Sequence, residues 1–451
     1  MKYSIIYPLL VIIMSSSCSD YLDLKPDQKM AIPKTLEHCE LLLNDYSAMN
    51  TGYPTLGEVA ADDYYLNTSD WKSLSNFDEQ HTYNWSLEFM TLNTHWQNPY
   101  KTVYLSNQIL SILRHLDQNN DKVKYDKTLG AAHFFRAFAF HQIASVFTMP
   151  YQVGTAESEL GIPLRLSPDL DYKSSRSNLA ATYTQIVVDY KQAIRYLPVV
   201  ETLKGRPAKA AAYAGLARVY LDLQDYDKAY AYADSCLSLK SDLLNYKDLK
   251  ASASLPIPRF NTEVLFPAIG IFSSPLGQSF ARIAPDLYHS FDVHDYRKTV
   301  YFKPNSFDVG TYAFKGSYDN SATTPFVGLT TSEVYLIRAE SAVRTNNIGQ
   351  GLRDLNTLLK NRIDPLFIVD VTETDPDLLL RIVLQERRKE LVFRGRRWSD
   401  LRRLNQDERF RKTINRSIDG QNYTLEPNSL KYAHLIPDLV ISESGIPQNK
   451  R

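Results

Sequence analysis

The residues with the clearest chemical potential form a run of arginines near the C-terminus, in the stretch QERRKELVFRGRRWSDLRR from Gln385 to Arg403. Its seven guanidinium groups are of the type that binds phosphate or nucleic acid. The whole chain, however, carries 51 basic and 51 acidic residues, so it lacks the positive charge of a nucleic-acid-binding domain. No nucleic-acid partner is expected, and the arginines need a different explanation.

A helical wheel over residues 380–394, at about 100° per residue, separates this stretch into two faces. Arg387 and Arg388 fall in the same stripe as the leucines, whereas Glu386 and Lys389 fall on the opposite side. A solvent-exposed charge run would instead place its arginines away from the leucines. The pattern therefore predicts that the arginines are buried in a packed interface.

A buried arginine needs a carboxylate, because an unpaired buried charge is costly. Glu390 has the spacing to pair with both Arg387 and Arg394 on one helix. Gly395 is placed to end that helix. We therefore interpret the arginine run as a structural network of ion pairs.

Motifs of catalysis and cofactor binding are missing from the sequence. It contains no G-x-S-x-G, H-E-x-x-H or G-x-G-x-x-G, and no phosphate-binding Gly-Lys-Ser/Thr loop. This favours a binding protein over an enzyme, and we expect neither a metal nor a cofactor. A glycosidase remains an alternative, because the two members of its catalytic carboxylate pair meet only in the fold.

The N-terminus has the pattern of a targeting segment. An apolar run from Ile5 to Met14 is followed by three serines and then by Cys18. Small residues that end at a cysteine resemble a bacterial lipoprotein cleavage site, in which the cysteine becomes the acylated first residue. We expect residues 1–17 to be a signal peptide and Cys18 to carry the lipid. The alternative is ordinary cleavage near Cys18 and a secreted protein.

Most of the remaining chain predicts helices. Two segments match the spacing of small and aromatic residues in a tetratricopeptide unit, and a third supplies half a unit. In the second of them Gly351 replaces the usual Ala. The segments are AAYAGLARVYLDLQDYDKAYAYADSCLSL, SEVYLIRAESAVRTNNIGQGLRDLNTLLK and YTQIVVDYKQAIRYLP. The predicted fold class is mainly α, with a tetratricopeptide-type helical scaffold.

Two long stretches do not fit this helical pattern. Residues 51–85 and 254–328 are rich in aromatic side chains, and the second also contains many Pro and Gly residues. Loops of this length are functional or disordered, and the aromatic content favours ordered loops. We expect one domain over residues 18–451, with these two irregular insertions facing the ligand.

The arginine-rich stretch resembles the C-terminal signature of the SusD/RagB family of Bacteroidetes outer-membrane lipoproteins. That signature is two basic residues, Glu-Leu, and then Gly-x-Arg-aromatic-x-Asp-Leu-x-Arg. Arg394 stands where family members usually have Glu. Further resemblances follow in the family's order, in CSDYLDLKP, WQNPYKTVYLSNQIL, LGAAHFFRAFAFHQIASVFTMPY, GRPAKAAAYAGLARVYL and LIPDLVISESGIPQN.

This resemblance implies a lipid-anchored protein on the cell surface at the outer membrane. Such proteins act as a lid on a SusC-like TonB-dependent transporter, capture an oligo- or polysaccharide, or in some members peptides, and deliver it for import. They are not enzymes. Two other classes remain open: a tetratricopeptide adaptor that binds only proteins, and a carbohydrate-active enzyme.

Sugars stack their apolar faces on aromatic rings and pair their hydroxyls with polar side chains. Trp85 and Trp96 match structural tryptophans of the family, and Trp398 belongs to the C-terminal signature, which leaves Trp71 outside every structural motif. The alternative for Trp71 is that it packs its loop onto the helices.

The expected ligand site combines residues from both irregular regions. We expect two stacking platforms and two polar partners in the first region, and two further aromatic contacts in the second. Asp62 has the alternative role of organising its loop. The predicted residues are, in this order, Trp71 and Tyr65, Asp62 and Asn67, and Phe280 and Tyr312.

Overall fold

The computed structural model describes residues 33–306 and 308–451, so the predicted signal peptide 1–17 and Cys18 lie outside the described residues. The described part is mainly helical, with seventeen α-helices and five pairs of short strands. This confirms the predicted fold class. None of the described helices combines the length and the apolar character needed to cross a membrane.

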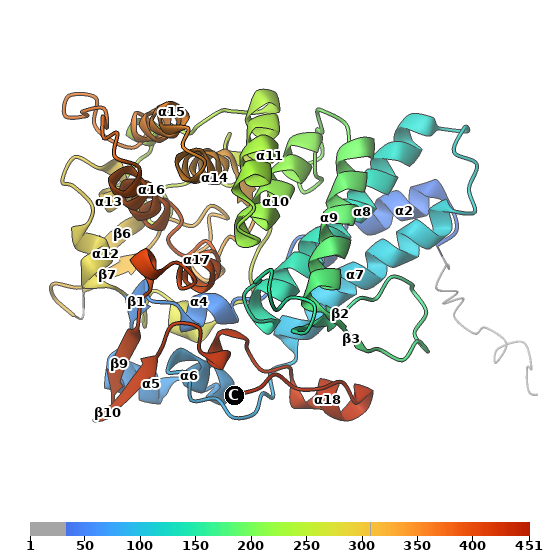
Figure 1. Ribbon diagram of the computed structural model, residues 1–451, viewed down its shortest axis with the longest axis horizontal. Coiled ribbons are helices and arrows are strands. Elements are labelled where there is room, and N and C mark those ends of the chain that lie inside the picture. The colour runs from blue at the N-terminus through green and yellow to red at the C-terminus, as the bar shows by residue number, and fades with distance from the viewer. Residues whose placement is uncertain (1–32, 307) are drawn as a thin grey trace, which may run out of the picture.

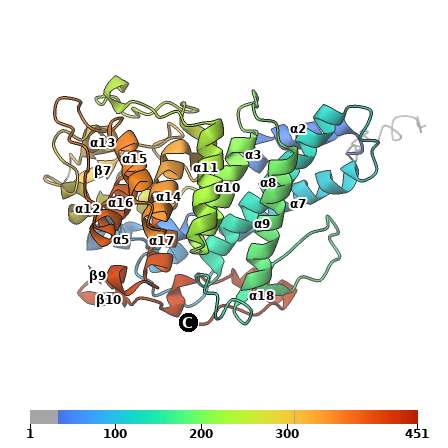
Figure 2. The same ribbon diagram turned by 45° about the horizontal axis from the view of Figure 1, so that its top comes forward.

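The long helices form a row in which sequence neighbours pack side by side (Figures 1 and 2). The row begins with the long antiparallel pair α7 and α8 and ends where α14 packs against both α15 and α16. The bounds are α7 (Thr94–Leu113), α8 (Lys122–Phe147), α9 (Leu179–Tyr196), α10 (Lys209–Asp222), α11 (Tyr226–Leu239), α14 (Thr331–Arg344), α15 (Ile348–Leu359) and α16 (Pro376–Glu390).

The predicted repeats are helical hairpins held together by small residues. The first unit is α10 and α11, the second is α14 and α15, and α9 is the half unit. A Cβ atom on Gly215 would lie 2.5 Å from the ring of Tyr190, and one on Gly351 would lie 2.6 Å from Cγ2 of Val343. Gly351 therefore permits the close approach of α14 and α15.

The main core lies where α8 meets the strand β4 (Val264–Phe266). The ring centroids of Phe134 and Phe138 lie 4.6 Å and 5.0 Å from that of Phe266, and all three side chains are buried. Tyr53 adds an edge-on contact to Phe138 at 4.9 Å. The run of small and aromatic residues in α8 thus anchors the first irregular region to the scaffold.

The described residues of both irregular regions contain more secondary structure than predicted. Asn67 and Asn76 accept hydrogen bonds from backbone N–H groups and so start two short helices in the first region. The first region contains α4 (Leu56–Ala60), β1 (Tyr64–Tyr65), α5 (Thr68–Ser73) and α6 (Phe77–Tyr83). The second contains β4, η4 (Ser274–Leu276), β5 (Arg282–Ile283), α12 (Pro285–His289), α13 (Tyr296–Tyr301), β6 (Phe302–Pro304) and β7 (Tyr312–Phe314).

Each strand pair is antiparallel: β1 with β5, β2 with β3, β4 with β8, β6 with β7, and β9 with β10. The remaining helical elements are α2 (Leu36–Asn44), α3 (Tyr46–Met49), α17 (Arg397–Leu404), α18 (Asp438–Ser444), η3 (Tyr246–Asp248), η5 (Glu408–Phe410) and η6 (Leu430–Tyr432). The remaining strands are β2 (Leu160–Pro163), β3 (Arg176–Asn178), β8 (Leu329–Thr330), β9 (Ile414–Ile418) and β10 (Gln421–Leu425).

The arginine run forms a buried network of ion pairs, as predicted. Most of its guanidinium groups reach carboxylates on other elements, and none of these buried groups is available to nucleic acid. Examples are Arg387 with Asp400 at 2.9 Å, Arg396 with Asp222 at 2.8 Å and Arg403 with Glu340 at 2.7 Å.

The predicted partners of Glu390 are wrong. Its carboxylate pairs with Arg362 at 2.8 Å and with Arg297 at 3.3 Å, and not with Arg387 or Arg394. Arg394 instead lies over an aromatic ring and donates to a threonine hydroxyl. The helical wheel considers one helix alone, whereas the true partners come from α13 and from the turn after α15.

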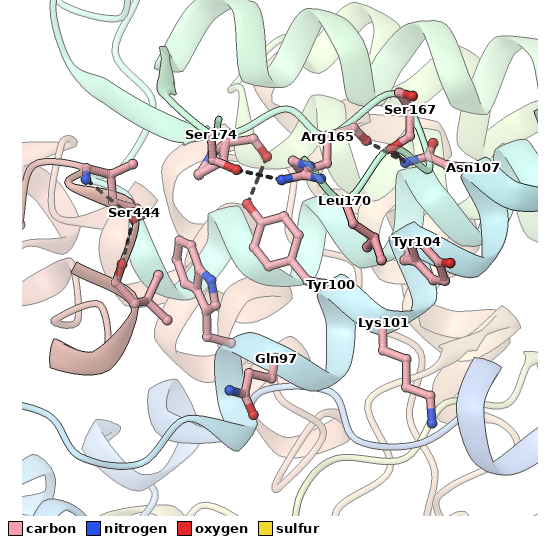
Figure 3. Close-up of a pocket in the computed structure, with 14 residues that line it drawn as sticks. Gln97, Tyr100, Lys101, Tyr104, Asn107, Arg165, Ser167, Leu170, Ser174 and Ser444 are labelled. Atoms are coloured by element: carbon pink, nitrogen blue, oxygen red, sulfur yellow. Dashed lines mark hydrogen bonds between the residues drawn. The ribbon is translucent and has the colours of Figure 1, made fainter. Parts of the chain in front are cut away.

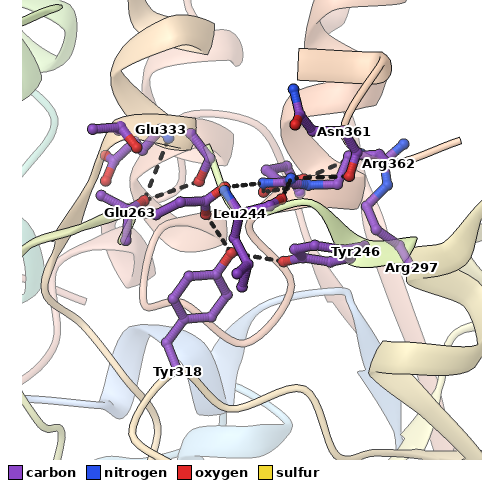
Figure 4. A network of polar contacts seen from close by, with 12 residues as sticks. Leu244, Tyr246, Glu263, Arg297, Tyr318, Glu333, Asn361 and Arg362 are labelled. Carbon is purple, nitrogen blue, oxygen red and sulfur yellow. Dashed lines mark hydrogen bonds and ion pairs between the residues drawn. The ribbon is translucent and has the colours of Figure 1, made fainter. Parts of the chain in front are cut away.

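Arg362 is the centre of this network (Figure 4). Its guanidinium also pairs with Glu263 at 2.6 Å. The hydroxyl of Tyr318 donates to the second carboxylate oxygen of Glu263 at 2.6 Å, and Tyr246 hydrogen-bonds to Tyr318 at 2.6 Å. The network thus links the last repeat to the second irregular region.

The side of α16 predicted to face solvent is also buried. Lys389 pairs with Glu386 at 2.7 Å and with Asp295 at 3.1 Å, because α13 and the turn before it cover this face. The helix ends at Glu390, before the predicted Gly395, although Gly395 does take a left-handed φ of +68°. Charged residues on both faces of α16 therefore stabilise the interior.

Candidate functional site

The carboxylate of Asp62 is engaged by basic side chains. Arg397 donates to it at 2.6 Å and 2.9 Å, and Lys412 lies 2.7 Å away. Burial raises the pKa of Asp62, but the opposing charges, with Arg397 first, hold it well below its usual range. These contacts match the alternative role of Asp62, in which it organises the loop.

The side chain of Asn67 acts as a helix cap. Its amide oxygen accepts from the backbone N–H of Asp70 at 2.8 Å and from the hydroxyl of Ser69 at 2.8 Å. Its amide nitrogen donates no hydrogen bond within the part of the chain that the structure describes. One half of this amide therefore stabilises α5, and the other half remains available to a ligand.

The two irregular regions meet at Arg282. In the β1–β5 pair, Tyr65 lies opposite Arg282, whose guanidinium pairs with both Asp70 and Asp308. Arg282 also donates to the carbonyl oxygen of Phe280 at 2.8 Å. The structure thus brings the predicted residues Tyr65 and Phe280 together.

Tyr312 lies on β7, which is beside β5. Its ring stacks on that of Tyr288 with centroids 3.6 Å apart and an interplanar angle of 13°. One face of Tyr312 is therefore covered by protein. Tyr312 thus lies on the strand beside the one that carries Arg282, and its ring is not an isolated stacking platform.

Trp71 belongs to a row of four rings on and beside α5 and α6. Its ring lies edge-on to His81 at 6.1 Å, His81 stacks on Phe77 at 3.9 Å, and Phe77 stacks on Phe89 at 5.5 Å. We call Trp71, His81, Phe77 and Phe89 the aromatic row. Phe77 is 48% exposed and Phe89 is 46% exposed, so the row offers apolar surface to solvent.

The row is held by specific hydrogen bonds. The indole N–H of Trp71 donates to the carbonyl oxygen of Gln80 at 2.8 Å, and the side-chain amide of Gln80 donates back to the carbonyl of Trp71 at 2.9 Å. Nδ1 of His81 lies 2.9 Å from the carbonyl oxygen of Phe77. These contacts fix α5 against α6 and set the order of the rings.

Two buried carboxylates fix α6 to its surroundings. Asp78 accepts from the backbone N–H groups of Thr91 and Leu92 at 2.6 Å and 2.5 Å. Glu79 accepts from the backbone N–H of Ser274, in the second irregular region, at 3.2 Å. The aromatic row therefore stands on a preorganised support, as a binding site requires.

Phe77, His81 and Phe89 are not among the predicted site residues. The spacing of Phe77 and His81, four residues apart after the cap Asn76, is the signal that places both on one face of a helix. That signal is lost when the stretch is interpreted as an irregular loop. Phe89 lies beyond the predicted region, and only the fold brings it to Phe77.

Two family models match the chain, and together they cover more than half of it. A model described as "Starch-binding associating with outer membrane" matches residues 20–221, and the SusD family model matches residues 294–434. The chain belongs to the SusD family. The aromatic row lies in the first matched segment, and the Arg362–Glu390 pair lies in the second.

Three known proteins, two of which are named as SusD proteins, resemble the chain over most of its length. SusD-like protein P2 of Formosa agariphila is 25% identical in an alignment 376 residues long that covers 68% of this chain and 71% of that protein. A SusD superfamily protein of Bacteroides thetaiotaomicron is 23% identical with a TM-score of 0.73, over 92% of this chain and 100% of the other. A putative sugar-binding protein of Bacteroides vulgatus is 22% identical with a TM-score of 0.75, over 92% and 98%. The two solved structures establish the shared SusD fold.

Proposed function

We propose that this SusD-family chain is a lipid-anchored glycan-binding protein of the cell surface at the outer membrane, and that the aromatic row contacts the glycan. Its partner in this proposal is a SusC-like TonB-dependent transporter, to which it delivers the bound glycan for import. The chain acts by binding and carries out no catalysis. Cys18 carries the lipid anchor.

The observation that carries the proposal is the half exposure of Phe77 and Phe89 in a row of stacked rings. Aromatic rings stack on the apolar faces of sugars, and nearby polar groups fix the orientation of the ligand. The free amide nitrogen of Asn67 and the hydroxyl of Tyr65 lie in the same irregular region. The printed names of relatives support the assignment, since one of the similar solved structures is called a SusD-like carbohydrate binding protein.

Glycan binding is tested by titrating the purified chain with a panel of polysaccharides in a calorimeter. The double variant Phe77→Ala, Phe89→Ala is then titrated with the polysaccharide that binds. We expect a loss of at least about tenfold in affinity, because two exposed anchor rings of a binding site are removed. Phe367→Ala is the matched control, because Phe367 is also half exposed but lies in the segment between α15 and α16.

The same titration separates the proposal from its alternatives. A shortened glycan among the products after long incubation would identify an enzyme. Failure of the whole panel, with retained binding of another protein, would identify a tetratricopeptide adaptor. The transporter is tested separately: a tagged chain purified from outer membranes should bring with it a large TonB-dependent barrel encoded by a neighbouring gene.

A further inference from the structure

A hollow lies between α7, the segment that follows β2, and the segment around α18 (Figure 3). Its volume is about 390 Å³, within the usual range of small-molecule sites, about 300–1,000 Å³. Its walls are mainly apolar and include Trp96, Tyr100, Tyr104, Pro163, Leu170 and Ile446. Leu170 is 75% exposed and stands at the rim.

The wall that carries Leu170 is held in place by Arg165. The guanidinium donates to the carbonyl oxygens of Tyr172 and Asp169 at 3.0 Å and 2.5 Å, and to the hydroxyl of Ser174 at 2.9 Å. Both Nη groups of Arg165 therefore donate within its own loop, so the guanidinium is not free for a bidentate contact. This argues against a phosphate or sulfate site, for which a free guanidinium is the usual ligand.

The same loop is also hydrogen-bonded to the helical scaffold. The side-chain amide of Asn107 on α7 donates to the carbonyl oxygen of Arg165 at 2.8 Å. The amide oxygen of Asn107 accepts from Arg136 on α8 at 2.8 Å, and Arg136 pairs with the buried Asp189 on α9. Three helices thus hold the loop over α7, and the hollow is preformed.

Trp96 leaves an unused donor at this hollow. The side chain is only 6% exposed, and its ring packs edge-on against Phe147 at 5.1 Å. Its indole N–H donates no hydrogen bond to any described residue, and neither do the hydroxyl of Tyr104 and the amide of Gln97. The indole nitrogen is not among the enclosed polar atoms that lack a partner, so it is open to solvent and an acceptor oxygen of a ligand can bind it.

We propose that this hollow is a second saccharide subsite, which takes one or two sugar units. The rings of Trp96, Tyr100 and Tyr104 offer surfaces for the apolar face of a sugar, and the free donors match its hydroxyl and ring oxygens. A purely apolar ligand would leave these donors unpaired. This proposal rests on the proposed glycan-binding function, but a sugar could bind in the hollow without touching the aromatic row.

The hollow and the aromatic row share a structural connection. Phe89 of the row is followed by Met90, whose carbonyl oxygen accepts from the backbone N–H of Asp438 at 2.8 Å. Asp438 begins α18, and Val440 and Ser444 of that helix line the hollow. In Figure 1, α5, α6 and α18 lie along the lower edge of the molecule. One long glycan that engaged both places would bind more tightly than a short one.

The test is saturation-transfer NMR on the purified full chain, with monosaccharides, disaccharides, benzoate and cinnamate as probes. Each probe is used at roughly 10 mM, which is about 10 times the dissociation constant expected for a weak site. We expect a sugar to bind and its signal to fall at least fivefold in Leu170→Asp. Leu166→Asp is the control, because Leu166 is exposed on the same loop but does not line the hollow. Trp96→Phe, which keeps a ring but removes the donor, should also weaken the signal.

The outcomes separate the subsite from the proposed function. Retention of the sugar signal in Trp71→Ala, together with its loss in Leu170→Asp, supports the subsite. Binding of the aromatic acids without any sugar overturns the assignment to saccharides. If polysaccharides bind through the aromatic row but no small probe responds to Leu170→Asp, the subsite alone is wrong. If no sugar and no polysaccharide binds, both proposals fail.

Discussion

The guanidinium of Arg362 lies side-on against the carboxylate of Glu390, with Nη2 2.8 Å from Oε1 and Nε 3.0 Å from Oε2. Both side chains are fully buried. Arg362 follows α15 and Glu390 ends α16, so the pair joins the end of the second repeat to α16. Glu263 binds the same guanidinium and extends the contact toward β4. The pair connects the helical scaffold with the second irregular region.

Removal of the Glu390 carboxylate should strongly destabilise the protein. Glu390→Ala leaves two buried guanidinium groups without this partner, and such a loss costs about 3–5 kcal/mol in the free energy of unfolding. Urea denaturation measures the change. Asp370→Ala is the control, because it removes an exposed pair with Lys360 and should change stability by no more than about 0.5 kcal/mol. Equal losses in the two variants would contradict the buried network.

Trp71→Ala should weaken binding of the polysaccharide by about 1–3 kcal/mol, the scale of a lost aromatic anchor. It should also lower stability slightly, because the indole N–H bonded to Gln80 is lost. Trp71→Phe keeps a ring in the row and loses only this hydrogen bond, so it should retain most of the affinity. Calorimetric titration and thermal melting measure the two effects. A variant without the ring that binds like the native chain would exclude Trp71 from the site.

Stability should depend on pH through Glu58, a buried carboxyl group next to the ion pairs of Asp62. Burial, and after it the charge of Asp63, raises the pKa of Glu58 to about 8 from an ordinary value of 4.5. The folded state therefore holds this proton more tightly than the unfolded state. The resulting stabilisation is fully present below about pH 4.5 and is lost as the pH rises through about 8.

Glu58→Gln should remove this dependence, because the amide stays neutral. Between about pH 5 and about pH 9 the native chain should lose roughly 1–4 kcal/mol relative to the variant, since one pKa unit corresponds to about 1.4 kcal/mol. Urea denaturation at both pH values measures the difference. A stability difference that stays the same at both pH values would show that Glu58 does not carry the proton.

Cys18→Ala should move the chain from the membrane fraction to the soluble fraction. The prediction rests on the small residues before Cys18, which resemble a lipoprotein cleavage site. Several acyl chains hold a protein stably on a membrane, whereas one chain holds it only marginally. Fractionation in cells that lack the transporter measures the anchor by itself. Continued membrane binding of the variant there would show that the anchor lies elsewhere.

The sequence by itself determined the scaffold of this protein. Helical periodicity and the spacing of small residues are local properties, so the hairpins of α10 with α11 and α14 with α15 could be predicted from short segments. The C-terminal signature indicated the SusD family for the same reason. The burial of the arginine run also followed, because arginines in an apolar stripe must be enclosed and paired.

Only the tertiary structure decided which groups meet. Glu390 takes its partners from Arg297 and Arg362, which no helical wheel of α16 includes. Phe89 joins Phe77 because Asp78 binds the backbone that follows Phe89, and this contact ties α6 to the segment before α7. Ion pairs and stacked rings act over a few ångströms between segments distant in sequence. Their partners are therefore set by the packing of the helices and not by local pattern.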